Sequence, residues 1–260
     1  MDLHLKNKVV VVTGGASGIG AAIVTGAARE GAVAVIVDKS AEAAHRVECD
    51  LRKSGGQTYS IVANLTAAEN CRRAIEETLE RCGRIDALVN NAGLNDRVGL
   101  EHGNPAEYVK SIERNLLHYY NLAHYALPSL KEARGSIVNI ASKTAVTGQG
   151  GTSGYASSKG AILALTREWA VELRPYEIRV NAVLPAEVWT PMYKSWIAGF
   201  PEPERKLNEI VSRIPFGKRM TAPEEIAAMV LFLISSQAGH ITGQHLYVDG
   251  GYVHLDRALS

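Results

Sequence analysis

The sequence is poor in cysteine, in net charge and in long hydrophobic runs, and each shortage excludes a class of protein. Its three cysteines (Cys49, Cys71 and Cys82) show no CxxC spacing and cannot all pair, which indicates reduced thiols and no metal site. The formal net charge is +1 and both signs are mixed along the chain, so no basic surface for nucleic acid or anionic membrane is expected. No stretch reaches the roughly 20 apolar residues of a membrane span. Residues 1–10 lack a signal-peptide core, and we therefore expect a cytoplasmic protein.

What the sequence does contain is a repeated alternation of short apolar runs and helical stretches. The predicted strands are residues 8–14, 32–38, 58–65, 85–93, 135–142, 178–186 and 245–251, and the predicted helices 18–31, 41–54, 68–82, 105–130, 152–174 and 222–235. Because the strands are continuously apolar, both of their faces should be buried, as in a parallel sheet between helices. The fold class is α/β, a single Rossmann-like, doubly wound domain over residues 1–260 with about seven strands.

One stretch departs from this alternation. Residues 187–220 contain four prolines and two tryptophans and show no clean periodicity. We interpret them as a substrate-loop insertion near the carboxyl ends of the strands, where ligands of such sheets bind.

The first strand is followed by a glycine-rich turn and then a helix. Gly14, Gly18 and Gly20 would let the backbone approach a pyrophosphate, and the amide groups at the helix N-terminus would bind it. Asp38 ends the second strand 18 residues after Gly20, the position of an acidic residue that binds a ribose 2′-hydroxyl. Because Asp38 would repel a 2′-phosphate, NAD is favoured over NADP, although the neighbouring Lys39 weakens that argument.

A phenol and an ammonium lie four residues apart in the stretch "SGYASSKGA", residues 153–161. On a helix, Tyr155 and Lys159 would be about 6 Å apart along one face. As a general base, Tyr155 must lower its pKa from about 10 to about 7, or by about 4 kcal/mol, and Lys159 with a positive nicotinamide ring could supply this. Ser142 would hold the substrate oxygen and Asn115 could anchor a water linked to Lys159, while the small residues between leave room for ligands.

Together these motifs resemble the short-chain dehydrogenase/reductase family over essentially the whole chain. The resemblance implies hydride transfer between NAD(P) and an alcohol or carbonyl, a catalytic tetrad and usually a homotetramer. The matching pieces are "TGGASGIG" (13–20), "NNAG" (90–93), Asn115, Ser142, "YASSK" (155–159), "NAVLPAEVWTPM" (181–192) and "YVDGG" (247–251).

Carried over position by position, the resemblance implies a tetrad of Asn115, Ser142, Tyr155 and Lys159. It also places Asn64 at the adenine, and Val188 and Thr190 at the nicotinamide carboxamide. Pro185-Ala186 stands where the family commonly has Pro-Gly, which restricts the backbone there. The implied cofactor-binding residues are Gly14, Ser17, Gly18, Ile19, Gly20, Asp38, Lys39, Asn64, Leu65, Asn91, Ala92, Gly93, Tyr155, Lys159, Pro185, Val188, Thr190 and Met192.

At the level of a branch, residues 113–125, 142–155, 185–200 and 250–259 resemble L-fucose dehydrogenases of the bacterial sugar-oxidising type. A sugar site needs polar groups for the hydroxyls and an apolar wall for the ring. The candidate substrate-binding residues are Asn95, Ser142, Gln149, Tyr155, Glu187, Tyr193 and Trp196.

Simpler interpretations stay open for several of these residues. Glu187 is equally consistent with a solvent-facing loop carboxylate. Trp189 and Trp196 are also typical of a packed lid or a subunit contact. His118 and His124 show no metal-ligand spacing and are expected at an interface or on the surface.

Three functions remain. The first is an NAD-dependent oxidation of the anomeric hydroxyl of an aldose, L-fucose or a relative such as D-arabinose, to its lactone. The second is a 3-oxoacyl or other ketone reductase of the same family. Two observations argue against it: Glu187 and Gln149 offer polar groups, and the chain has no basic patch that would bind an acidic carrier protein. The third, a non-catalytic NAD-binding interaction protein, is opposed by the intact Tyr155, Lys159 and Ser142.

Overall fold

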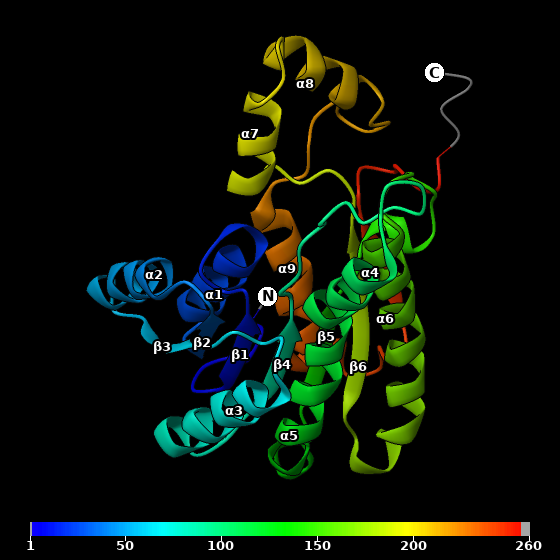
Figure 1. Cartoon of the computed structure of the whole chain (residues 1–260). Coiled ribbons are helices and arrows are strands. Elements are labelled where there is room, and N and C mark those ends of the chain that lie inside the picture. The colour runs from blue at the N-terminus through cyan, green and yellow to red at the C-terminus, as the bar shows by residue number, and fades with distance from the viewer. Residues whose placement is uncertain (1, 256–260) are drawn as a thin grey trace.

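A single sheet organises the chain, and all of its strands run in parallel. The computed structural model describes residues 2–255, and within them the strand order is β3-β2-β1-β4-β5-β6-β7 (Figure 1). The strands are β1 (Val9–Thr13), β2 (Val33–Asp38), β3 (Gln57–Val62), β4 (Ala87–Asn90), β5 (Ser136–Ile140), β6 (Arg179–Pro185) and β7 (His245–Val248). The predicted doubly wound α/β fold with seven strands is confirmed.

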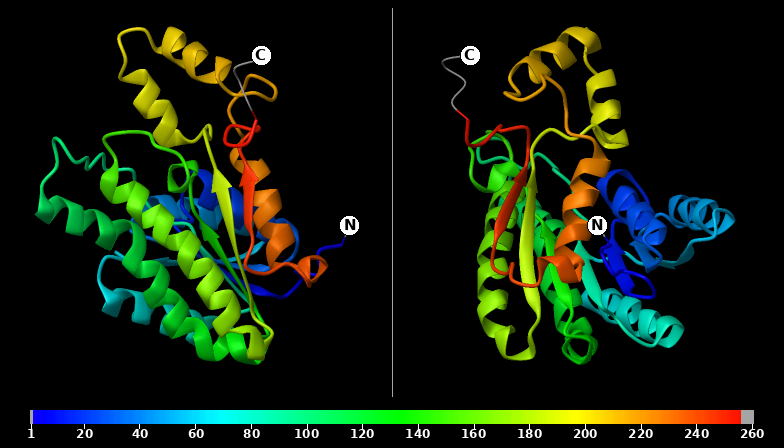
Figure 2. Two further views of the ribbon diagram at one scale, coloured as in Figure 1. Left: turned by 90° about the vertical axis from the view of Figure 1, so that its right-hand side faces the viewer. Right: turned by 180° about the vertical axis from the view of Figure 1, so that it is seen from behind.

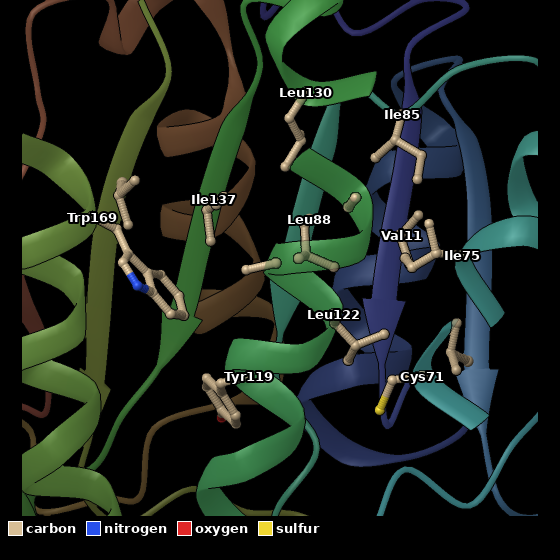
Figure 3. Close-up of a cluster of buried hydrophobic side chains, with 14 of the residues drawn as sticks. Val11, Cys71, Ile75, Ile85, Leu88, Tyr119, Leu122, Leu130, Ile137 and Trp169 are labelled. Atoms are coloured by element: carbon tan, nitrogen blue, oxygen red, sulfur yellow. The ribbon is translucent and has the colours of Figure 1, made fainter. Parts of the chain in front are cut away.

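Alternate residues of the strands enter two separate cores, as a period of two requires. In β1, Val9 and Val11 face one core while Val10 and Val12 face the other. The first core contains side chains of α3 (Ala68–Cys82), α5 (His118–Ala133) and α6 (Ser153–Glu172), and Figure 3 shows several of them against the sheet. The second contains side chains of α1 (Gly18–Arg29), α2 (Ala41–Lys53) and α9 (Pro223–Ile234). Burial on both faces explains why the strands are continuously apolar.

The predicted helix over 105–130 is interrupted. The chain forms α4 (Pro105–Ile112), then a π-helical turn at Glu113–Leu117, and then α5. Within that turn, the Asn115 side-chain amide donates to the Ser111 carbonyl at 3.0 Å. A π-helical turn has no signature in the apolar periodicity, and such turns frequently occur at functional sites.

The insertion at 187–220, called the lid below, is more regular than predicted. It contains α7 (Pro191–Ala198) and α8 (Pro203–Ser212), which project beyond the carboxyl ends of β6 and β7 (Figure 2). A proline stands at the start of each helix, where its missing N–H costs nothing. Both helices are too short for a pattern of apolar residues to reveal them.

The described residues contain neither a helix able to cross a membrane nor a cluster of metal ligands. Cys49, Cys71 and Cys82 are free, as predicted. Residues 256–259, the end of the 250–259 stretch used for the closer resemblance, lie outside the described residues.

Candidate active site

A cleft of about 840 Å³ opens at the carboxyl edge of the sheet, where the strand order reverses between β1 and β4. It collects most of the residues that the sequence selected. These are Gly14, Ser17, Gly18, Ile19, Asp38, Lys39, Asn64, Leu65, Asn91, Ala92, Gly93, Asn95, Ser142, Tyr155, Lys159, Pro185, Val188, Thr190, Met192 and Tyr193.

The glycine-rich turn at one end of the cleft has no space for side chains. Gly14 and Gly18 have φ of +62° and +52°, which other residues adopt with strain. A Cβ on Gly20 would lie 2.0 Å from the carbonyl oxygen of Gly14, so Gly20 lets α1 pass directly behind the turn. Gly20 therefore supports the turn from behind and is not part of the cleft lining.

Thr13 and Asn91 connect the turn to β4. The Thr13 hydroxyl accepts from the backbone amides of Asn91 and Ala92 at 2.9 and 3.0 Å, and the Asn91 side-chain amide donates to the Thr13 carbonyl at 2.9 Å. These bonds hold the two strand ends together across the switch point. Thr13 was missed as a site residue, although it opens the matching "TGGASGIG" motif.

Asp38 lies at the end of β2, on the rim of the same cleft. Its carboxylate accepts from the backbone amides of Ala16 and Ser40 at 3.1 and 3.0 Å. These bonds fix the carboxylate beside the glycine-rich turn, in the place where an adenosine ribose would lie. Lys39 lines the cleft next to it and is exposed.

At the other end of the cleft, Tyr155 and Lys159 project from the first turns of α6, beside Ser142 at the end of β5. Tyr155 shares a side-chain hydrogen bond with Ser142. The Lys159 ammonium lies 5.5 Å from the centre of the Tyr155 ring. Gly93 borders this group, and a Cβ there would come within 3.4 Å of Lys159 Nζ. The phenol, the hydroxyl and the ammonium thus converge on one point of the cleft.

Burial changes the proton affinities at this point. It lowers the pKa of Lys159 to about 7, and no carboxylate contacts the ammonium among the described residues. It also raises the pKa of Tyr155, an effect that the Ser142 hydrogen bond opposes. Without ligands, desolvation outweighs the Ser142 hydrogen bond, so the pKa of Tyr155 lies above its ordinary value.

Lys159 is held by a residue that the sequence did not suggest. Its ammonium donates to the Ile140 carbonyl at 2.7 Å and to the Tyr119 hydroxyl at 3.1 Å. The Tyr119 hydroxyl itself donates to the Ile140 carbonyl at 2.9 Å, and its side chain is fully buried. Tyr119 looked like one of several aromatic residues on a helix, and its proximity to Lys159 follows from the packing of α5 against α6.

Asn115 lies behind the cleft and is fully buried. Its side-chain oxygen accepts from the backbone amide of Leu94 at 2.7 Å, while its amide donates to Ser111. The side chain thus secures the segment that follows β4.

One further expectation is wrong. His118 does not lie on the surface: it is 1 % exposed, lines the cleft, and burial lowers its pKa to about 4. Gly154, which precedes Tyr155, has no room for a side chain, because a Cβ there would lie 2.4 Å from the Ser111 hydroxyl oxygen. It is small so that α6 can approach α4.

The predicted substrate residues divide into two groups. Asn95 and Tyr193 line the cleft with Ser142 and Tyr155, while Gln149 is exposed and lies outside it. Trp196 packs edge-on against Tyr193 and Phe200, at 5.1 and 4.9 Å between ring centres, within the lid. Trp196 is thus placed as a lid residue.

Glu187 is neither solvent-facing nor alone. Its carboxylate forms an ion pair with Lys143, and the two side chains are 15 % and 11 % exposed. It also accepts a hydrogen bond from Tyr193, and burial with this carboxylate raises the pKa of the Tyr193 phenol. Lys143 was missed, although it directly follows Ser142 in the sequence.

Comparison with known proteins identifies relatives of this chain. A family model described as Enoyl-(Acyl carrier protein) reductase matches residues 14–253. L-fucose dehydrogenase of Bos taurus is 37% identical over 252 residues, covering 96% of this chain and 91% of that protein. The 3-oxoacyl-(acyl-carrier-protein) reductase of Thermotoga maritima is 36% identical over 252 residues, 96% of this chain and all of that protein.

Among solved structures, the crystal structure of the Cj0485 dehydrogenase superposes with a TM-score of 0.95 at 44% identity, covering 100% of this chain and 99% of that one. These matches extend over nearly the whole chain, and the solved structure shares its fold. The chain therefore belongs to the short-chain dehydrogenase/reductase family and is an oxidoreductase.

Proposed function

We propose that this enzyme uses NAD to oxidise the anomeric hydroxyl of an aldose, L-fucose or a close relative such as D-arabinose, to the lactone. The observation that carries the proposal is the Lys143–Glu187 ion pair, whose chain neighbours Ser142 and Ala186 line the cleft. A largely buried pair of charges next to the cleft suits a substrate that presents several hydroxyl groups. The similarity to L-fucose dehydrogenase supports the same substrate class.

The residues present fit a dinucleotide. A Cβ at Gly14, Gly18 or Gly93 would enter the space that the cofactor needs or crowd the groups that line it. The N-terminus of α1 directs its amides toward the pyrophosphate position, Asp38 would bind the adenosine ribose, and Asn64 would lie at the adenine. When bound, NAD supplies the hydride acceptor.

In this proposal Tyr155 removes the proton from the anomeric hydroxyl, and Ser142 holds the same oxygen by a hydrogen bond. For that step the phenol must lose its proton, although burial raises its pKa in the ligand-free protein. The charged form of Lys159, 5.5 Å from the ring, favours the phenolate, as does any further positive charge in the cleft. Asn115 positions the segment after β4, against which the substrate oxygen would lie.

A second function has its own support. Reduction of 3-oxoacyl or other ketones is favoured by the similarity to the Thermotoga reductase. A hydrophobic acyl chain, however, would offer no hydrogen bonds to the Lys143–Glu187 pair, whereas sugar hydroxyls would. The pair therefore favours a hydroxylated substrate over an acyl chain.

The same proposal includes three expectations from the sequence. NAD is preferred to NADP because the Asp38 carboxylate faces the ribose position. A homotetramer is expected from the family resemblance, and the cytoplasm is the expected location.

The test is an assay of the purified protein with NAD and a panel of aldoses, simple secondary alcohols, acyl ketones and steroids, followed by NADH absorbance. Oxidation of L-fucose or D-arabinose with lactone as product is the expected result. Turnover of acyl ketones or steroids without any turnover of sugars would overturn the proposal in favour of the second function.

A further inference from the structure

Two residues of opposite charge meet just beyond the ends of neighbouring strands. Lys143 follows Ser142 at the end of β5, and Glu187 follows Pro185-Ala186 at the end of β6. Because β5 and β6 are parallel and paired, both residues leave the sheet at the same edge. Ser142 and Ala186, their neighbours in the chain, line the cleft. The ion pair therefore adjoins the Ser142 end of the cleft, where its neighbours rather than the two charged residues themselves form the lining.

Two phenols from other parts of the chain complete this group. Tyr193 of α7 donates to the Glu187 carboxylate, and Tyr193 itself lines the cleft. The Tyr252 ring lies 3.9 Å from Lys143 Nζ. Asp249 fixes the turn that carries Tyr252, since its carboxylate accepts from the backbone amides of Gly251 and Val253 at 2.8 and 2.9 Å.

The pair has hydrogen-bonding capacity that the protein does not use. An ammonium has three N–H donors, and among the described residues Glu187 is the acceptor that Lys143 contacts. A carboxylate can accept about four hydrogen bonds, and Glu187 is contacted by Lys143 and Tyr193. Withdrawing both charges from water is costly, and the fold of the sheet does not require them. A ligand with several hydroxyl groups would use this capacity.

We propose that Lys143 and Glu187 together bind neighbouring hydroxyl groups of the substrate and make the enzyme specific for polyhydroxylated alcohols. This inference rests on the proposed oxidation of a sugar. Each hydroxyl both donates and accepts, so one can accept from Lys143 while its neighbour donates to Glu187. A substrate that lacks either hydroxyl would lose a hydrogen bond to a largely desolvated charge and would be oxidised less efficiently.

Tyr193 extends this recognition to the lid. Its hydroxyl bonds to Glu187, and its ring lies between Trp189 and Trp196, at 6.5 and 5.1 Å between ring centres. The Arg97 guanidinium, from the segment after β4, lies 5.8 Å from the centre of the Trp196 ring. The pair is thus the polar end of an aromatic row, and that row offers the apolar surface that a sugar ring needs.

The experiment compares Lys143→Met, Glu187→Gln and wild type on L-fucose and on its 2-, 3- and 4-deoxy analogues. Hydrogen bonds to charged groups predict a loss of kcat/KM for L-fucose of roughly 10- to 100-fold in each variant. For at least one deoxy analogue the wild type should already show this loss, and the substitution should then add little. NADH binding, followed by its fluorescence, should remain unchanged because the pair lies outside the nucleotide end.

Lys194→Met is the matched control, because Lys194 is an exposed lysine of the same lid. Its ammonium lies 5.5 Å from the Trp189 ring centre and contacts no carboxylate within residues 2–255. It should leave the ratio between L-fucose and its deoxy analogues unchanged. If a single substitution prevents folding, Lys143→Met combined with Glu187→Leu replaces the pair by apolar groups and should show the same loss of discrimination.

Two negative results can be told apart. If the wild type oxidises no sugar, the proposed function fails. If it oxidises L-fucose but the substitutions reduce activity on L-fucose and on every deoxy analogue by the same factor, the sugar dehydrogenase stands and the role of Lys143 and Glu187 is overturned.

Discussion

The cleft has a floor, meaning the strand ends together with the glycine-rich turn, Tyr155 and Lys159, and a lid at residues 187–220. The floor and the lid are held in place by different means. The floor depends on backbone groups at the ends of buried strands: Thr13 accepts from the amides of Asn91 and Ala92, and Lys159 donates to the Ile140 carbonyl. The lid depends on side chains, with the Lys143–Glu187 pair and the ring of Trp196 near Arg97. Strand ends tolerate few changes, whereas side-chain contacts can be exchanged one at a time. We therefore expect substitutions in the floor to affect the reaction itself and substitutions in the lid to affect the choice of substrate.

The largest effect should come from the floor. Tyr155→Phe removes the hydroxyl that we propose as the base and keeps the ring, so turnover should fall by at least about 100-fold, the usual size of a lost acid–base group. Steady-state assays with NAD and the favoured sugar measure this. Tyr120→Phe is the matched control, since Tyr120 is 54% exposed on α5, outside the cleft. Retained activity in the Tyr155 variant would place the base elsewhere.

A second substitution in the floor tests how much the buried Lys159 ammonium lowers the free energy of unfolding. Burial lowers the pKa of Lys159 to about 7, whereas an unfolded lysine keeps its proton to about 10. Between these two pKa values the unfolded chain binds more protons than the folded one, so the stability of the folded wild type rises with pH. The destabilisation caused by the buried ammonium is therefore fully present below pH 7. Lys159→Met removes the cost, while Tyr119 still donates to Ile140.

The variant should therefore gain stability relative to wild type, and the gain should be larger at pH 6 than at pH 9 by about 2 kcal/mol. Denaturant unfolding at the two pH values measures it. A gain that does not change with pH would show that Lys159 does not titrate near neutrality. The Lys159→Met variant should be more stable but inactive, because it lacks the charged group near Tyr155.

The smallest effect should appear at the nucleotide end, where the floor meets solvent. Asp38→Asn keeps the shape of the side chain and removes its charge, so the preference for NAD over NADP should fall by about tenfold, the effect of one partly exposed charge. Lys39→Met should act in the opposite direction, because it removes a cation from the position of the 2′-phosphate. The ratio of kcat/KM for the two cofactors measures both. If neither substitution changes that ratio, these residues do not reach the ribose.

Most of the floor was predictable because its signals are local. The glycines at 14, 18 and 20 and the end of β2 at Asp38 are separated by short distances along the chain, and helical spacing places Tyr155 one turn from Lys159. The lid was not predictable in this way. Its helices are short, and Lys143 and Arg97, which contact Glu187 and Trp196, come from distant parts of the chain.

Tyr119 and Gly154 are two residues of the floor whose roles the sequence could not predict. Each is an ordinary residue in the sequence, and its role depends on which helix packs against α6. Tyr119 from α5 meets Lys159, and Gly154 meets Ser111 of α4. The interruption at Glu113–Leu117 changes the direction of the residues between these two helices, and apolar periodicity does not record it.

By itself, the sequence determined a parallel sheet covered on both faces, a dinucleotide turn and a phenol beside an ammonium, because backbone preference and burial act over a few neighbouring residues. Only the tertiary structure decided how these groups are surrounded. Burial lowers the pKa of Lys159, no carboxylate of residues 2–255 contacts its ammonium, and Lys143 meets Glu187. The reason is that electrostatic energies depend on distance and desolvation in three dimensions, which residues remote in the chain create together.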